Sequence, residues 1–199
     1  MPAADPAAAE AGAVETPEPR AVTAGGGGES KTAITVIAVA VVLTLDIITK
    51  FWVVRTFDLY ETTPVLGDFF RFTYTHNRGA AFGIDIGEHS RIFFLVLSLV
   101  ALGVLAAIYR ATPAWDRLRV LALSLVAGGA LGNILDRIRY ERGVVDFLDF
   151  GVGASRFPVF NIADTAVTIG ATLLLISFWL EGRREREEEE GGRPGEAGD

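Results

Sequence analysis

Four long apolar runs, separated by polar segments, dominate the pattern of hydrophobic and polar positions along this chain. The runs cover residues 32–54, 92–109, 118–135 and 162–180. At about 1.5 Å of rise per residue, helices of this length cross the hydrocarbon core of a bilayer. The pattern therefore predicts an all-α membrane protein with four transmembrane helices.

The segment between the first two runs, residues 56–90, is too polar to span a membrane. Within it, residues 69–75 (FFRFTYT) are aromatic and β-prone, and Pro64 and Gly67 precede them. We therefore expect a small β-rich extracytoplasmic segment here. The sequence NRGAAFG at residues 77–83 then places small residues after a polar pair, which suits close backbone approach to a ligand but also fits an ordinary turn.

The two ends of the chain have too little apolar content to fold. Residues 1–31 are rich in Ala, Gly, Pro and Glu and predict a disordered extension, and residues 181–199 predict a disordered acidic tail. The formal charge of −7 comes from these ends, because the acids and bases between them balance. The remaining domain, residues 32–180, has no basic stripe with interleaved aromatics, so nucleic acid is not an expected partner.

The rarer residue types exclude several kinds of chemistry. The chain has no cysteine and two histidines, so disulfides, thiolate nucleophiles and cysteine metal sites are excluded. A histidine-rich metal site and a Ser-His-Asp triad are both poorly supplied. We expect neither a metal nor a cofactor.

Polar residues beside the last two apolar runs are the candidates for chemistry, because carboxylates next to hydrocarbon are costly unless paired or facing a cavity. The alternation of spans places four aspartates near one membrane boundary: Asp46, Asp136, Asp146 and Asp164. Two carboxylates brought close together cannot easily both ionise, so one holds a proton. Such a pair can activate water with one member and protonate with the other, which is the chemistry of amide hydrolysis.

Structural roles compete with chemistry for some of these acids. Asp46 and Lys50 are spaced i, i+4, which favours a structural ion pair between helices. Asp136 lies beside Arg137, and a pair or helix-end contact is favoured there. Asp164 falls in the first turn of a helix, where an acid also complements the helix dipole.

Orientation follows from the distribution of basic residues. Four spans place both termini on one side, together with the short basic loop 110–119. The positive-inside rule then favours cytoplasmic termini and an active site near the outer face, although the opposite loops also carry arginines.

Four segments, taken in order, resemble bacterial lipoprotein signal peptidase, also called signal peptidase II. They are residues 46–50 (DIITK), 77–82 (NRGAAF), 132–137 (GNILDR) with 144–147 (VVDF), and 160–164 (FNIAD). Each motif is weak alone, but their order on four spans is specific. The resemblance covers about residues 32–180.

The resemblance implies an intramembrane aspartyl endopeptidase of the bacterial cytoplasmic membrane. Members of this family remove signal peptides from prolipoproteins and cut before a cysteine that bears diacylglycerol. The family's catalytic pair falls on Asp146 and Asp164. Its polar positions lining the site match Asn77, Asn133, Arg137 and Asn161, while Asp46, Lys50 and Asp136 would support the site.

The resemblance also bears on architecture and partners. Residues 56–90 would match a small β-rich cradle and a mobile element over the site. The expected partners are prolipoproteins with a lipidated cysteine and membrane lipid, and we expect a monomer. Thr165 stands where serine is also usual, and the N-terminal extension is unusually long.

Two other functions were weighed against this one. A Ser/Lys peptidase would use Lys50, but no serine stands in a motif. A transporter could use the acids as a proton relay, but four spans without an internal repeat make that a weak alternative.

Overall fold

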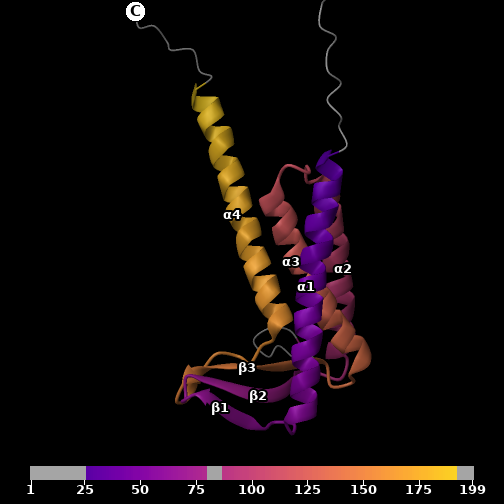
Figure 1. The fold of residues 1–199 in the computed structure, drawn as a ribbon, viewed down its shortest axis with the longest axis vertical. Coiled ribbons are helices and arrows are strands. Elements are labelled where there is room, and N and C mark those ends of the chain that lie inside the picture. Colours follow the sequence, from indigo (N-terminus) through magenta and orange to yellow (C-terminus); the bar gives the residue numbers. More distant parts are fainter. Residues whose placement is uncertain (1–25, 80–86, 192–199) are drawn as a thin grey trace, which may run out of the picture.

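The computed structural model describes residues 26–79 and 87–191, with side chains over residues 30–79 and 87–187. Its helices are α1 (Gly26–Thr56), α2 (Ser90–Ala111), α3 (Arg117–Arg139) and α4 (Ile162–Gly191). Its strands are β1 (Thr62–Leu66), β2 (Phe70–Asn77), β3 (Val144–Val152) and β4 (Ser155–Arg156). The strands gather at one end of the helices, opposite the C-terminal end of α4 (Figure 1).

All four of these helices are long and apolar enough to cross a membrane. Large apolar side chains on their outward faces are exposed, among them Ile37, Val100 and Leu175. Extended exposed apolar surface of this kind marks a membrane-contacting face. The predicted fold class, four transmembrane helices with a small β-rich segment, is confirmed.

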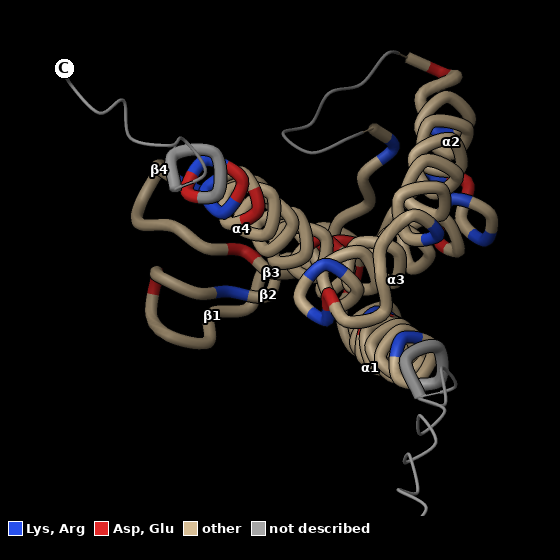
Figure 2. Tube along the Cα trace, turned by 90° about the horizontal axis from the view of Figure 1, so that it is seen from above, with Lys and Arg blue, Asp and Glu red and all other residues tan. Residues whose placement is uncertain are grey.

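Helix α3 occupies the centre of the bundle and contacts α1, α2 and α4, as the view along the helices shows (Figure 2). Glycines make these contacts close. A Cβ added at Gly128 would lie 3.1 Å from Cβ of Val42 on α1, and one added at Gly129 would lie 2.8 Å from Cγ2 of Val167 on α4. These small residues therefore allow α3 to pack closely against α1 and α4.

The sheet is antiparallel, with strand order β1-β2-β3-β4. Strand β2 confirms the β-prone segment, but β3 is an addition to the predicted architecture. Its sequence, VVDFLDFGV, is a short and almost continuously apolar run, whose type periodicity alone does not decide. A buried cluster of Val53, Tyr74, Val145 and Phe147 joins the end of α1 to β2 and β3, and so fixes the sheet on the bundle.

Both terminal helices extend beyond the predicted domain of residues 32–180. Helix α1 begins at Gly26, and α4 continues through 181–191, where we expected a disordered acidic tail. Glu and Arg are good helix formers, and Arg183 lies 3.7 Å from Glu187 one turn later, so the exposed helix can continue. Residues 1–25, 80–86 and 192–199 lie outside the described residues, and with them the rest of both tails and Ala80–Gly83 of the predicted motif.

Candidate active site

Asp146 and Asp164 reach one site from different elements. Asp146 lies on β3, and Asp164 lies in the first turn of α4. The chain between them turns back because Phe160 exchanges backbone hydrogen bonds with Leu148, at N···O distances of 3.1 and 2.8 Å. This pairing holds the start of α4 against β3, and both aspartates line one cavity.

Asn161 links the two aspartates and is itself fully buried. Its Nδ2 donates to Oδ1 of Asp146 at 2.7 Å, and its Oδ1 accepts the backbone N–H of Asp164 at 2.8 Å. Oδ2 of Asp164 accepts the N–H of Asn161 in return, at 3.3 Å. This reciprocal pair is a capping box, so the helix-capping role considered for Asp164 is present alongside its place in the cavity.

The other oxygen of Asp164 faces α3. Asn133 donates its Nδ2 to Oδ1 of Asp164 at 2.8 Å. Asn133 is partly exposed to the cavity, and its Oδ1 also accepts from Nδ2 of Asn161 at 3.2 Å. Both oxygens of Asp164 therefore accept hydrogen bonds, which fix the orientation of its carboxyl group.

Beneath the site, Lys50 is the centre of a buried ion-pair cluster. Its Nζ lies 2.7 Å from Oδ2 of Asp46 and 2.8 Å from Oδ2 of Asp136, and it donates to Oδ1 of Asn133 at 3.1 Å. Asp46 also accepts the N–H of Ala163 at 3.0 Å, and thus satisfies a second donor at the start of α4. The predicted pair of Asp46 and Lys50 is confirmed, and it belongs to a larger cluster that also includes Asp136 and Asn133.

Asp136 has a different partner from the one expected. The sequence favoured its neighbour Arg137, but successive residues on a helix do not face each other. Asp136 instead binds Lys50 and accepts the N–H of Val145 at 3.1 Å. These contacts tie the end of α3 to both α1 and β3.

Arg137 faces the other way, into the cavity. Its guanidinium donates to the backbone oxygens of Asn133 at 3.2 Å and Gly79 at 2.9 Å. The residue is 8% exposed, and within the described part of the chain its Nε has no hydrogen-bond partner. Arg137 therefore brings a positive charge and an unused donor to the site.

The protonation of Asp146 differs from that of an ordinary carboxyl group. Burial, followed by the negative charge of Asp164, raises the pKa of Asp146 to about 8. Hydrogen bonds from Asn161 and Asn77 act in the opposite direction but are the smaller effect. At neutral pH Asp146 therefore holds its proton. An acid–base pair requires one carboxyl group that is protonated in this way.

Two cavities meet at Asp146. The first, which we call the α4 cavity, has a volume of about 460 Å³ and an apolar wall from Val167 to Ile169. The second, the outer cavity, has a volume of about 520 Å³. The two share the following lining residues: Asn77, Gly79, Asp146, Pro158 and Val159.

The predicted site residues divide into two groups. Those that line the α4 cavity are Asn77, Asn133, Arg137, Asp146 and Asp164. Asn161, Asp46, Lys50 and Asp136 lie behind them and hold them in place. No group of three or more His, Asp or Glu side chains in the described ranges is arranged to hold a metal ion.

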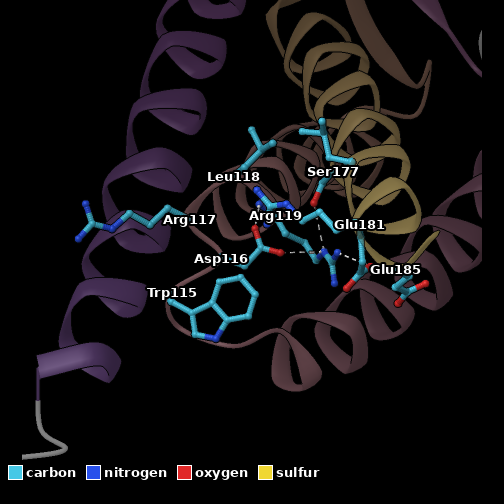
Figure 3. A pocket seen from close by; sticks show the side chains of 10 residues that line it. Trp115, Asp116, Arg117, Leu118, Arg119, Ser177, Glu181 and Glu185 are labelled. Atoms are coloured by element: carbon cyan, nitrogen blue, oxygen red, sulfur yellow. Dashed lines mark hydrogen bonds and ion pairs between the residues drawn. The ribbon is translucent and has the colours of Figure 1, made fainter. Parts of the chain in front are cut away.

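A third cavity, of about 530 Å³, lies at the opposite end of the bundle, between the start of α3 and α4 (Figure 3). Arg119 crosses it, donating to Ser177 at 3.4 Å and to Glu181 at 2.7 Å. It contains none of the predicted site residues, and we assign it a packing role between α3 and α4.

Sequence reasoning missed several residues that line the site. Pro158 and Val159, before α4, contribute to both cavities, and Arg142 contributes to the outer one. Their only local signal is a position between two motifs, and strand β3 was needed to bring them to the site.

Known proteins resemble this chain over most of its length. A sequence model of the family described as Signal peptidase (SPase) II matches residues 38–180. The lipoprotein signal peptidase of Geobacter sulfurreducens is 42% identical over 144 residues, which cover 72% of this chain and 89% of that protein. The one from Halothermothrix orenii is 42% identical over 145 residues, 73% of this chain and 94% of that protein.

Two solved structures, both described as bacterial membrane enzymes, share the fold. One has a TM-score of 0.68 at 28% identity and covers 83% of this chain and 95% of its own. The other has a TM-score of 0.65 at 32% identity and covers 73% and 92%. With the family match over residues 38–180, these likenesses establish that the chain belongs to the signal peptidase II family.

Proposed function

We propose that this protein removes signal peptides from prolipoproteins by aspartyl chemistry, with Asp146 and Asp164 as the catalytic pair. The observation that carries the proposal is the link through Asn161, which hydrogen-bonds to both residues inside one cavity. The substrate is a prolipoprotein with a diacylglyceryl-modified cysteine, and the cut falls before that cysteine.

The reaction uses one proton shared by the pair. The ionised carboxylate accepts a proton from water, whose oxygen attacks the carbonyl carbon of the scissile peptide, while the protonated carboxyl gives its proton to the carbonyl oxygen. In the second step the proton returns from the resulting gem-diol and the other carboxyl protonates the leaving nitrogen. The C–N bond breaks, and the pair recovers its starting charge.

The surrounding polar groups hold the substrate. Arg137 and Asn77 line the cavity beside Asp146, where their side-chain N–H groups can donate to substrate carbonyl oxygens. A peptide leaving water for this cavity would otherwise bury unsatisfied carbonyls, at a cost of about 1–3 kcal/mol each. Binding here positions the scissile bond over the pair.

The α4 cavity is suited to a substrate that arrives from lipid. Its apolar wall, from Val167 to Ile169, lies along a membrane-spanning helix, and its polar end carries the aspartates at the start of that helix. We propose that the signal helix and the lipid chains approach along this wall. The proposal also places both termini in the cytoplasm and the aspartates near the outer face of the membrane. The enzyme works as a monomer.

The Ser/Lys alternative gains no support from this arrangement. Lys50 contacts Asp46, Asp136 and Asn133, and none of these partners is a serine. Ser155, the serine of the second outer loop, is exposed on β4.

The test is cleavage of a diacylglyceryl-modified prolipoprotein by purified protein in detergent or nanodiscs. We expect release of the signal peptide and a new N-terminal cysteine, identified by mass spectrometry. The same substrate without the lipid is the control for the lipid requirement. Intact substrate after incubation with correctly folded protein would contradict the proposal.

A further inference from the structure

The outer cavity and the α4 cavity are lined by different parts of the fold. It is lined by residues of the sheet and of the loops around it: Tyr60, Thr75, His76, Asn77, Arg78, Gly79, Arg142, Asp146, Pro158 and Val159. None of these residues belongs to a membrane-spanning helix. The outer cavity therefore opens on the water side of the site, whereas the α4 cavity follows the membrane.

The charge of the outer cavity is positive. Arg78 and Arg142 are exposed, and neither forms an ion pair with an acidic side chain of the described residues. Asp146 is the one acid among the lining residues, and it holds its proton at neutral pH because burial raises its pKa. Burial lowers the pKa of His76, so this ring adds no charge at pH 7.

Two other arginines of the sheet, Arg71 and Arg156, are already paired. Arg71 and Arg156 both bind Asp149, at 3.1 Å and 2.6 Å, and both also lie near Asp68. Arg78 and Arg142 differ from these two, because both line the outer cavity and neither forms an ion pair with an acidic side chain of the described residues. Tyr60 and Thr75 add hydroxyl donors to the same walls.

The path of the substrate connects the two cavities. In the proposed function the signal helix approaches along the apolar wall of the α4 cavity, and the chain then crosses Asp146, where the two cavities meet. The polar residues after the scissile bond leave through the outer cavity, because it opens away from the spans. An extended chain advances about 3.3 Å per residue, so the first few residues of the mature protein occupy the outer cavity.

We propose that Arg78 and Arg142 form a subsite for an acidic side chain among the second to fourth residues of the mature lipoprotein. This inference rests on the proposed function and adds a preference to it. A carboxylate is the group that two unpaired guanidiniums and two hydroxyls bind best, since all four supply donors. The subsite selects among prolipoproteins and takes no part in bond cleavage.

The experiment compares diacylglyceryl-cysteine peptides that differ by a single Asp or Asn at the second, third or fourth mature residue. For one exposed pair we expect kcat/KM to favour Asp by about twofold to fivefold at low ionic strength, mainly through KM. The preference should shrink in 0.5 M salt, because exposed charges are screened. The double variant Arg78→Glu/Arg142→Glu should reverse it and favour Asn.

Arg55→Glu is the matched control, because Arg55 is an exposed arginine at the same end of the bundle that rests on the ring of Phe51, outside the outer cavity. This variant should keep the preference for Asp. Equal rates for Asp and Asn peptides at all three positions in the unaltered enzyme would overturn the subsite while leaving the proposed function intact. Failure to cut either peptide would overturn both.

Anionic lipid headgroups are the other source of negative charge at this depth. If they occupied the cavity, Arg142→Glu would change the rates for Asp and Asn peptides by the same factor, and the change would depend on phosphatidylglycerol in the nanodisc. That result would also overturn the subsite.

Discussion

Nζ of Lys50 lies 3.1 Å from Oδ1 of Asn133, and this contact decides which end of the Asn133 amide faces Asp164. An ammonium group only donates, so it must meet the amide oxygen. The amide nitrogen is then left to donate to Asp164, at 2.8 Å. A buried lysine on α1 thus orients the carboxyl group of Asp164 on α4 through a side chain on α3.

The first prediction concerns removal of this lysine. Lys50→Met leaves Asp46 and Asp136 buried without their cation, and breaking a buried pair in this way costs about 3–5 kcal/mol. We expect a large drop in the thermal unfolding temperature measured in detergent, and lower activity in the protein that remains folded.

A matched pair of variants separates charge from packing in that prediction. Lys31→Met, near the other end of α1, removes hydrogen bonds to the carbonyls of Tyr109 and Thr112 but leaves no carboxylate alone, so it should cost less. Adding Asp136→Asn to Lys50→Met should recover part of the stability. An equal loss of stability in Lys50→Met and Lys31→Met would mean that the buried carboxylates do not depend on Lys50.

The second prediction concerns the contact between α3 and α4. A Cβ at Gly129 would meet Cγ2 of Val167 at 2.8 Å and the backbone oxygen of Ala163 more closely still. Gly129→Ala should therefore destabilise the fold by about 1–3 kcal/mol and push α4 away from Asn133. Gly103→Ala on α2, where nothing lies within 4 Å, is the control and should leave unfolding temperature and activity unchanged.

Much of this architecture could be predicted because it depends on composition within single segments. Four apolar runs of sufficient length predict the four spans, and the aromatic, β-prone residues 69–75 predict strand β2. The pair Asp46 and Lys50 followed from helical spacing alone. Each of these features is local, so the physics that produces it can be seen in a window of one or two helix turns.

What escaped prediction depends on distant pairing. Strand β3 exists because β2 lies beside it, with Thr75 opposite Asp146, and nothing within its own sequence distinguishes it from the end of a buried helix. The partner of Asp136 was misjudged for the same reason. Arg137 is nearest in sequence, but Lys50 is nearest in space, at 2.8 Å.

The third prediction is a pH dependence that follows from Asp146. Its pKa is raised from the ordinary 3.8 to about 8, so the shared proton is lost as pH rises through about 8. We expect kcat to fall about tenfold per pH unit above that point. A profile that stays flat to pH 10 would show that the pair does not depend on this proton.

The stability of the folded protein should also depend on pH through this proton. Between pH 4 and 8 the folded protein keeps a proton on Asp146 that the unfolded chain releases, so this group's contribution to stability is lost as pH rises through the window. Asp146→Asn cannot ionise, so this variant should lose less stability between pH 5 and 9 than the unaltered protein. Thermal unfolding at several pH values measures the difference.

The fourth prediction fixes the orientation. The chain has no cysteine, so a single introduced cysteine is a clean probe. With both termini in the cytoplasm, Ser155→Cys on exposed β4 should react with an impermeant thiol reagent in spheroplasts, and Trp115→Cys, 74% exposed between α2 and α3, should react only after the membrane is permeabilised. The opposite labelling pattern would place the aspartates on the cytoplasmic side.

The last prediction identifies which aspartates react. Asp46 and Asp136 both pair with Lys50, whereas Asp146 and Asp164 line the cavity and share Asn161. Asp146→Asn and Asp164→Asn should each lower the rate of cleavage by about 10³-fold or more, since Asn keeps the shape of Asp but cannot exchange a proton. Both proteins should still insert and bind a lipidated peptide.

The double variant and Asp136→Asn test the same assignment from two other sides. Groups that act as a unit are non-additive, so Asp146→Asn/Asp164→Asn should be little slower than either single variant. Asp136→Asn keeps an oxygen for the N–H of Val145 but weakens the contact with Lys50, so it should lower folded yield more than turnover per folded molecule. Normal turnover in either Asp146→Asn or Asp164→Asn would remove that residue from the mechanism. A well-folded Asp136→Asn protein that binds substrate but does not cut it would instead make Asp136 a member of the reacting group, because its charge would then matter beyond the ion pair.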